Sequence, residues 1–220
     1  MSEESVRVPL LDAFYQSYLA DETAAHFVAR VSEHYTQGTL ARLAIHGSRT
    51  TRRAAVLAVG FLGGYDCNMV LGRALHDDDR VVRLLAENSI RELWLRDGSP
   101  EQQHWIQHIV RLNDCGRFEE AVREASQLIR EAEGFAEAWN QRAIAYFRTN
   151  RYAESLRDCK QTIRRNAFHF PCAIGMGHCY LEMFEAAAAL ECFRWALGVN
   201  PDLENVRAQI GYLERALNGG

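Results

Sequence analysis

The sequence predicts an all-α protein, an α-solenoid in which antiparallel helix pairs follow one another along the chain. Three observations support this prediction. The chain is similar to itself at one period in its first half and at a second period in its second half. Within each copy, apolar residues recur at helical spacing. The 220 residues include only 4 prolines and 15 glycines, so no long disordered segment is expected. We expect no strand.

The composition is that of a soluble globular protein, with 48% hydrophobic and 25% charged residues. The net charge is −4 and neither half is basic, which weighs against nucleic-acid binding driven by charge. The first residues do not have the pattern of a secretory signal, and no apolar run approaches the ~18 residues that span a bilayer. We therefore expect a cytoplasmic protein that does not bind a membrane.

The chain is expected to begin with a capping segment, residues 1–20. An amphipathic helix is predicted from Leu10 to Leu19. It carries Leu11, Phe14, Tyr15 and Tyr18 on one side.

A 31-residue period is found in residues 21–100. Placing Arg52 on Arg83 superimposes four further pairs at offsets that trace one helix face, with small residues where helices approach closely. These pairs are Ala55/Ala86, Ala58/Ser89, Val59/Ile90 and Leu62/Leu93. The same shift backwards reaches a more degenerate copy at Asp21. A second helix of each pair is predicted after Gly38 and after Asp66, with Leu40 and Leu71 again 31 residues apart. The run RRAAVLAVGFLGG…LGRALHDDDRVVRLLAENSI resembles the short HEAT-like repeats of phycobilisome lyases.

Three adjacent acidic residues, Asp77 to Asp79, lie between two predicted helices. An aspartate directly before a helix accepts hydrogen bonds from its free N–H groups, so we interpret the three as a cap. HEAT-like repeats pair such aspartates with arginines, and Arg83 is the expected partner. A divalent cation is the alternative, but calcium requires six or more oxygen ligands.

A 34-residue period takes over in residues 101–203. It relates Trp105 to Trp139, Phe118 to Tyr152, and Tyr146 to Tyr180. The segments EAWNQRAIAYFRTNRYAESLRDCKQTI and RLNDCGRFEEAVREASQLI resemble tetratricopeptide (TPR) repeats. Three repeats are predicted, at 102–135, 136–169 and 170–203, followed by a capping helix in 204–220. The resemblance to both families implies one right-handed superhelix, a HEAT-like array fused to three TPRs, with Pro100 in the first turn of the joining helix.

The TPR resemblance also implies a function, because in that family the first helices of the pairs line a concave groove that captures peptides. Carried onto this sequence, the groove contains an apolar stripe and side chains that can hydrogen-bond a peptide backbone. The predicted binding residues are Ile106, Val110, Asn140, Gln141, Ile144, Phe147, Arg148, Ile174, His178 and Leu181. Members that clamp a chaperone's C-terminal carboxylate have basic residues where this chain has Ile106, Pro171 and Gly175, so that ligand is disfavoured.

No motif for catalysis, phosphate binding or a cofactor is present. His169, Cys172, His178 and Cys179 could bind a metal by residue type. On the expected repeat, however, Cys179 faces the interior and His178 the groove, so these side chains diverge. We predict neither a metal nor a cofactor, and expect the 6 cysteines to be reduced and buried.

The predicted function is therefore a non-catalytic scaffold or adaptor that binds a protein or peptide partner. Two alternatives remain: a bilin lyase or isomerase, from the HEAT-like resemblance, and a nucleic-acid-binding protein using Arg42, Arg49, Arg52 and Arg53. Trp195 is expected on the outer side of its helix, where it contacts either the closing helix or another subunit.

Overall fold

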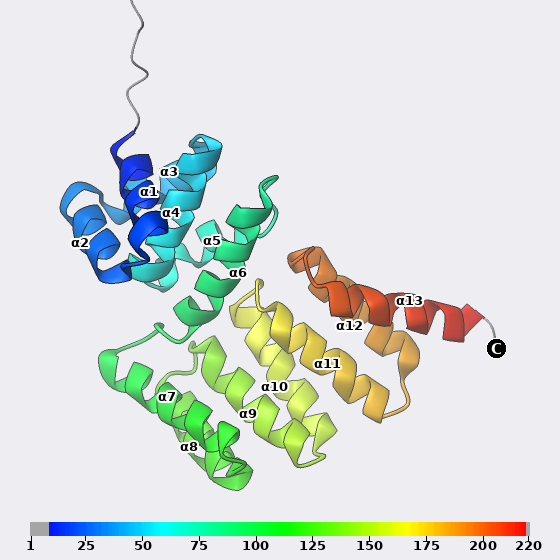
Figure 1. The fold of residues 1–220 in the computed structure, drawn as a ribbon. Coiled ribbons are helices and arrows are strands. Elements are labelled where there is room, and N and C mark those ends of the chain that lie inside the picture. The colour runs from blue at the N-terminus through cyan, green and yellow to red at the C-terminus, as the bar shows by residue number, and fades with distance from the viewer. Residues whose placement is uncertain (1–8, 219–220) are drawn as a thin grey trace, which may run out of the picture. The chain divides into compact units, whose positions relative to one another are not determined.

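The computed structural model describes residues 9–218, and within this range it contains thirteen α-helices, one short 3₁₀ helix and no strand (Figure 1). The prediction of an all-α fold is confirmed. Neighbouring helices pack in succession, as in a solenoid. None of the helices in this range combines the length and the apolar character needed to cross a bilayer.

The chain divides into two compact units, Met1–Leu93 and Trp94–Gly220. The division falls before Pro100, where the sequence placed the junction between its two arrays. The helices of the first unit are α1 (Leu10–Asp21), α2 (Ala24–His34), α3 (Gln37–His46), α4 (Arg49–Leu62), α5 (Asn68–Ala74) and α6 (Arg80–Trp94, whose last residue belongs to the second unit), with the 3₁₀ helix η1 (Tyr65–Cys67) before α5.

Helix α4 is the centre of the first unit, because α1, α2, α3 and α5 all pack against it. Six consecutive residues, Ala54 to Val59, are buried, as expected for a helix that is covered on every side. The small residues predicted for close approach, Ala55, Ala58 and Ala86, are fully buried. Ser89 of α6 lies so close to α4 that a Cβ added to Gly60 would clash with it.

The second unit contains α7 (Pro100–Asp114), α8 (Phe118–Glu131), α9 (Ala136–Arg148), α10 (Tyr152–Arg165), α11 (Phe170–Glu182), α12 (Ala186–Val199) and α13 (Glu204–Asn218). Each helix packs on the next, and α9 also contacts α7 and α11 (Figure 1). The second helices of the three pairs begin at Phe118, Tyr152 and Ala186, which reproduces the 34-residue period.

The turn inside each pair has the same geometry. Gly116, Asn150 and Phe184 all adopt positive φ, at 73°, 59° and 60°. In each turn the following N–H donates to a carbonyl five residues back, with N···O distances of 2.8 Å from Arg117 to Leu112, from Arg151 to Tyr146 and from Glu185 to Tyr180. Although the third copy lacks the usual glycine, it makes the same turn, with Phe184 in the left-handed region and 96% exposed.

Helix α7 begins at a capping box. The Ser99 hydroxyl accepts from the Gln102 N–H, and the Gln102 side chain accepts from the Ser99 N–H. Pro100 occupies the first turn, as predicted, where its missing N–H removes no helical bond.

Candidate functional site

An apolar pocket of about 260 Å³ lies between α9, α10 and α11. We call it the α9–α11 pocket. Its lining consists of Asn140, Ala143, Ile144 and Phe147 from α9, Ser155 and Cys159 from α10, and Pro171, Cys172, Ile174, Gly175 and His178 from α11. Helical spacing of three or four residues brings the α9 and α11 side chains to one face of each helix.

Five of the ten predicted groove residues converge on this pocket: Asn140, Ile144, Phe147, Ile174 and His178. The α10 wall, Ser155 and Cys159, was not predicted, since the resemblance assigned the groove to first helices only. The signal for it was present in the sequence, because both residues are small and lie one helical turn apart.

The prediction for Ile106 needs correction. Its side chain is fully buried in the core formed by α7, α8 and α9, together with Ile109 and Leu128, so it offers no surface to a ligand. The physical reason is that α7 turns its Ile106 face toward its own partner helices.

The other four predicted residues lie outside the α9–α11 pocket lining. Gln141 is buried and its side chain is bonded on two sides, to Glu137 and to Asn113. Arg148 places its guanidinium 5.3 Å from the ring centroid of Phe118. Leu181 packs against the core cluster of α12 and α13, and Val110 is half-buried on α7.

The polar atoms that border the pocket are largely bonded within the protein. Asn140 Nδ2 donates to Glu137 Oε1 at 2.8 Å, and Ser155 Oγ donates to the Ala143 carbonyl at 2.9 Å. Burial lowers the pKa of His178 below its ordinary value, and the nearby Glu182 carboxylate only partly offsets this. His178 is therefore neutral at pH 7, and the pocket presents an uncharged, mainly apolar interior.

The pocket's two thiols behave as small apolar groups. Burial, followed by the neighbouring Cys159, raises the pKa of Cys172 well above its ordinary value, so this thiol stays protonated. The expectation that the cysteines are free and buried holds for most of them, but Cys115, in the turn after α7, is exposed.

Behind the pocket, Glu137 is buried with a full set of hydrogen bonds. Asn140 and Gln141 donate to its Oε1, and His169 Nε2 donates to its Oε2 at 3.0 Å. Although burial raises the pKa of Glu137, the hydrogen bond from His169 and those from the two amides bring it below the ordinary value. The Trp94 ring stacks on His169 with centroids 4.2 Å apart.

The orientation of His169 follows from these bonds. Its Nδ1 accepts the Cys172 N–H at the start of α11, so the ring proton is on Nε2 and points to Glu137. His169 is therefore turned away from the pocket that His178 lines, and the four metal-capable residues of this segment do not converge. Within residues 9–218, no group of three or more histidine, cysteine, aspartate or glutamate side chains is arranged to hold a metal.

Of the three aspartates in the first unit, Asp79 caps α6, as predicted for this acidic run. Asp79 Oδ1 accepts from the Val81 and Val82 N–H groups at 3.0 and 3.1 Å. The hydrogen bond from Arg53 lowers the pKa of Asp79 to about 2; burial opposes this, and the two backbone bonds add to it. Asp77 Oδ1 accepts the Asp79 N–H at 2.8 Å, which closes the turn.

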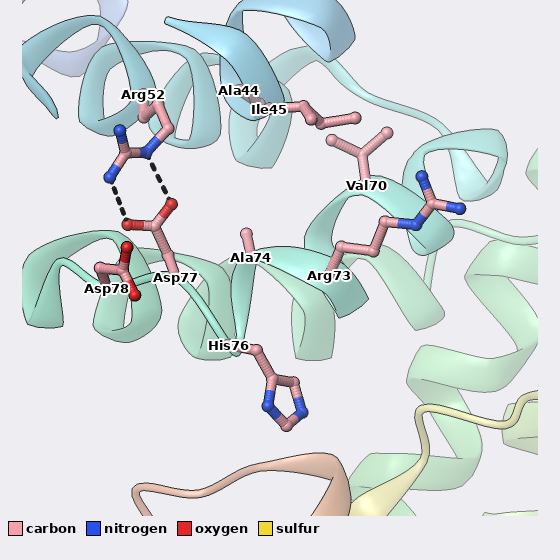
Figure 2. Close-up of a pocket in the computed structure, with 9 residues that line it drawn as sticks. All are labelled: Ala44, Ile45, Arg52, Val70, Arg73, Ala74, His76, Asp77 and Asp78. Carbon is pink, nitrogen blue, oxygen red and sulfur yellow. Dashed lines mark hydrogen bonds and ion pairs between the residues drawn. The ribbon is translucent and has the colours of Figure 1, made fainter. Parts of the chain in front are cut away.

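The arginine partners of these carboxylates differ from the prediction. Arg52 holds Asp77 through two bonds of 2.7 Å, as Figure 2 shows, and Arg53 holds Asp79 through bonds of 2.9 and 2.6 Å. Arg83, the expected partner, donates to the backbone carbonyls of Asp77 and Asp78. The carboxylates therefore tie α4 to the start of α6, and their oxygens are occupied by guanidinium and backbone donors that a cation would have to displace.

This arrangement also bears on the nucleic-acid alternative. Two of its four arginines, Arg52 and Arg53, are neutralised by Asp77 and Asp79, and a third, Arg49, lies 3.7 Å from Asp79. A basic surface that could attract phosphates is thus compensated at its centre.

No protein-family model matches this chain, and no curated protein sequence matches it. Among solved structures, it is similar to the TPR2AB-domain:pHSP90-complex of yeast Sti1, with 16% sequence identity, 92% of this chain and 93% of that chain covered, and a TM-score of 0.47. At this TM-score the similarity identifies no ligand or partner of this chain.

Proposed function

We propose that this protein is a non-catalytic scaffold that binds a short protein segment in the second unit, with one apolar side chain of that segment seated in the α9–α11 pocket. The observation that carries the proposal is the convergence of Ile144, Phe147 and Ile174 on one open, uncharged pocket. Apolar cavities bordered by a few polar atoms are where proteins take up ligand side chains.

The exposure of Ile144 supports the same proposal. It is 38% exposed although it is aliphatic, and it stands at the pocket rim between Asn140 and Phe147. Covering such a side chain with an apolar group of a ligand removes its surface from water, which favours binding.

A glycine in the lining permits a clean test. A Cβ added to Gly175 meets no atom within 4 Å, so we expect a leucine there to extend from open space into the pocket volume. Gly198 on α12 has the same open surroundings and lines no described pocket, which makes Gly198→Leu the matched control.

The experiment probes an array of short random-sequence peptides with the purified wild type and both variants. We expect the wild type and Gly198→Leu to bind the same subset of peptides, enriched in large apolar residues, and Gly175→Leu to lose that subset. A wild type that binds no peptide, or a Gly175→Leu protein that binds like the wild type, contradicts the proposal. Thermal melting of both variants checks that the fold is retained.

A further inference from the structure

The α9–α11 pocket continues into a second depression. A pocket of about 600 Å³ lies between α11 and the segment that leads into α13, and it shares Ile174 and His178 with the first pocket. The two therefore form one groove that passes over the α11 face carrying these two residues. An extended peptide whose apolar side chain occupies the first pocket places its next residues in the second.

The charge of this second part of the groove is acidic. Asp202 and Glu204 line it. Neither pocket has a lysine or arginine among its described lining residues. A cation close by is Arg207, which lies 3.8 Å from Glu204 and donates to the Pro201 carbonyl at 2.6 Å.

His178 lines both pockets but adds no positive charge at pH 7, because burial lowers its pKa and keeps it neutral. Beside the second pocket the described charged groups are therefore two carboxylates, Asp202 and Glu204, and one arginine, Arg207. Glu204 is 82% exposed in its side chain, so its carboxylate is accessible to a ligand cation. Complementary charge of this kind selects partners and suppresses those of like charge.

We propose that the groove is specific for a basic segment, in which an apolar residue is followed directly by arginine or lysine. This inference rests on the proposed function and adds the chemistry of the ligand. The apolar residue enters the α9–α11 pocket, and the cationic side chains lie over Asp202 and Glu204.

The probes are three fluorescein-labelled peptides in a common glycine–serine frame, each with one phenylalanine followed by two arginines, two glutamines or two glutamates. A fourth peptide has alanine in place of the phenylalanine in the arginine series. Binding is measured by fluorescence anisotropy at low and at moderate salt. We expect the arginine peptide to bind at least about tenfold more tightly than the glutamate peptide, with glutamine between them, and the difference to shrink as salt rises.

Charge-reversal variants locate the effect. Glu204→Lys is expected to reduce the preference for arginine over glutamate several-fold. Glu131→Lys, which makes the same change in net charge at an exposed position on α8, is expected to leave the preference unchanged.

The failures of the two proposals look different. If the phenylalanine peptides bind with equal strength whatever their charge, and Gly175→Leu abolishes that binding, the basic specificity is wrong and the peptide-binding function stands. Tighter binding of the glutamate peptide than of the arginine peptide likewise overturns the basic specificity alone. If none of the four peptides binds while the wild type binds peptides of the array, the basic specificity alone is overturned; if the array peptides do not bind either, both proposals are overturned.

Discussion

At the scale of single residues, Asp79 is the clearest case of a side chain whose ionisation supports the fold. Its pKa of about 2 means that the native state holds the carboxylate charged over a range in which the unfolded chain binds a proton. The folded pKa is depressed, so the stabilisation is complete above the ordinary value of 3.8 and is lost as the pH falls toward 2.

We therefore expect Asp79→Ala to lower the free energy of unfolding by at least about 1 kcal/mol at pH 7, because the cap of α6 is removed. The difference in the free energy of unfolding between Asp79→Ala and the wild type is expected to narrow as the pH falls from 4 to 2. Urea denaturation at several pH values measures it, with Asp78→Ala, at an exposed position in the same turn, as control. A difference that stays constant down to pH 2 would show that Asp79 does not titrate as described.

The cysteines make a second residue-scale prediction. Cys115 is exposed, whereas burial raises the pKa of Cys179 and of Cys192 to about 11, and that of Cys172 well above its ordinary value. Because the thiolate is the reactive form, a thiol reagent at pH 8 should modify Cys115 rapidly, the half-buried Cys192 more slowly, and the buried Cys172 and Cys179 only after unfolding. A native protein that shows no fast phase, or keeps it in Cys115→Ser, contradicts this.

At the scale of elements, two glycines in α11 have opposite roles. A Cβ on Gly175 meets open space, whereas a Cβ on Gly177 would lie 2.5 Å from the ring of Phe193 on α12, which is fully buried. Gly177 is thus required by the close packing of α11 on α12, and Gly175 is required by nothing in the fold.

We expect Gly175→Ala to raise the free energy of unfolding by about 0.5–1 kcal/mol, because glycine is unfavourable inside a helix. We expect Gly177→Ala to lower it by about 1–3 kcal/mol through overpacking against Phe193. Chemical denaturation of the two variants in parallel measures both. Equal stabilities would mean that α11 and α12 are not packed as closely as described.

Elements were also what the sequence predicted best. The helix starts at Phe118, Tyr152 and Ala186 follow the 34-residue period because the period records how often the same turn recurs. The third turn forms at Phe184 without a glycine, since the helices on both sides determine the chain path there. A residue other than glycine in the left-handed region carries an energetic cost, and the repeat pattern does not predict this cost at Phe184.

At the scale of the whole molecule, binding in the groove should be visible as a change in local stability. A ligand at a hundredfold excess over its Kd stabilises the native state by about 2.7 kcal/mol. We expect the phenylalanine–arginine peptide to slow amide hydrogen exchange most in α9, α11 and α13, the elements that border the groove. Gly175→Leu should show no such protection. Protection confined to α1–α5 would place the ligand elsewhere.

By itself, the sequence determined the helical class, the two repeat periods and the positions of the helices, because these depend on apolar spacing and turn residues that are local along the chain. It also determined that the acidic run Asp77–Asp79 caps a helix, which the structure shows for Asp79. Only the tertiary structure decided which isoleucine is covered and which is open: Ile106 is fully buried, whereas Ile144, at a different position of the 34-residue repeat, is 38% exposed. The structure likewise selected Arg52 and Arg53 as the partners of the aspartates and brought an acidic segment beside an apolar pocket, because these contacts join residues distant in sequence whose pairing no local pattern encodes.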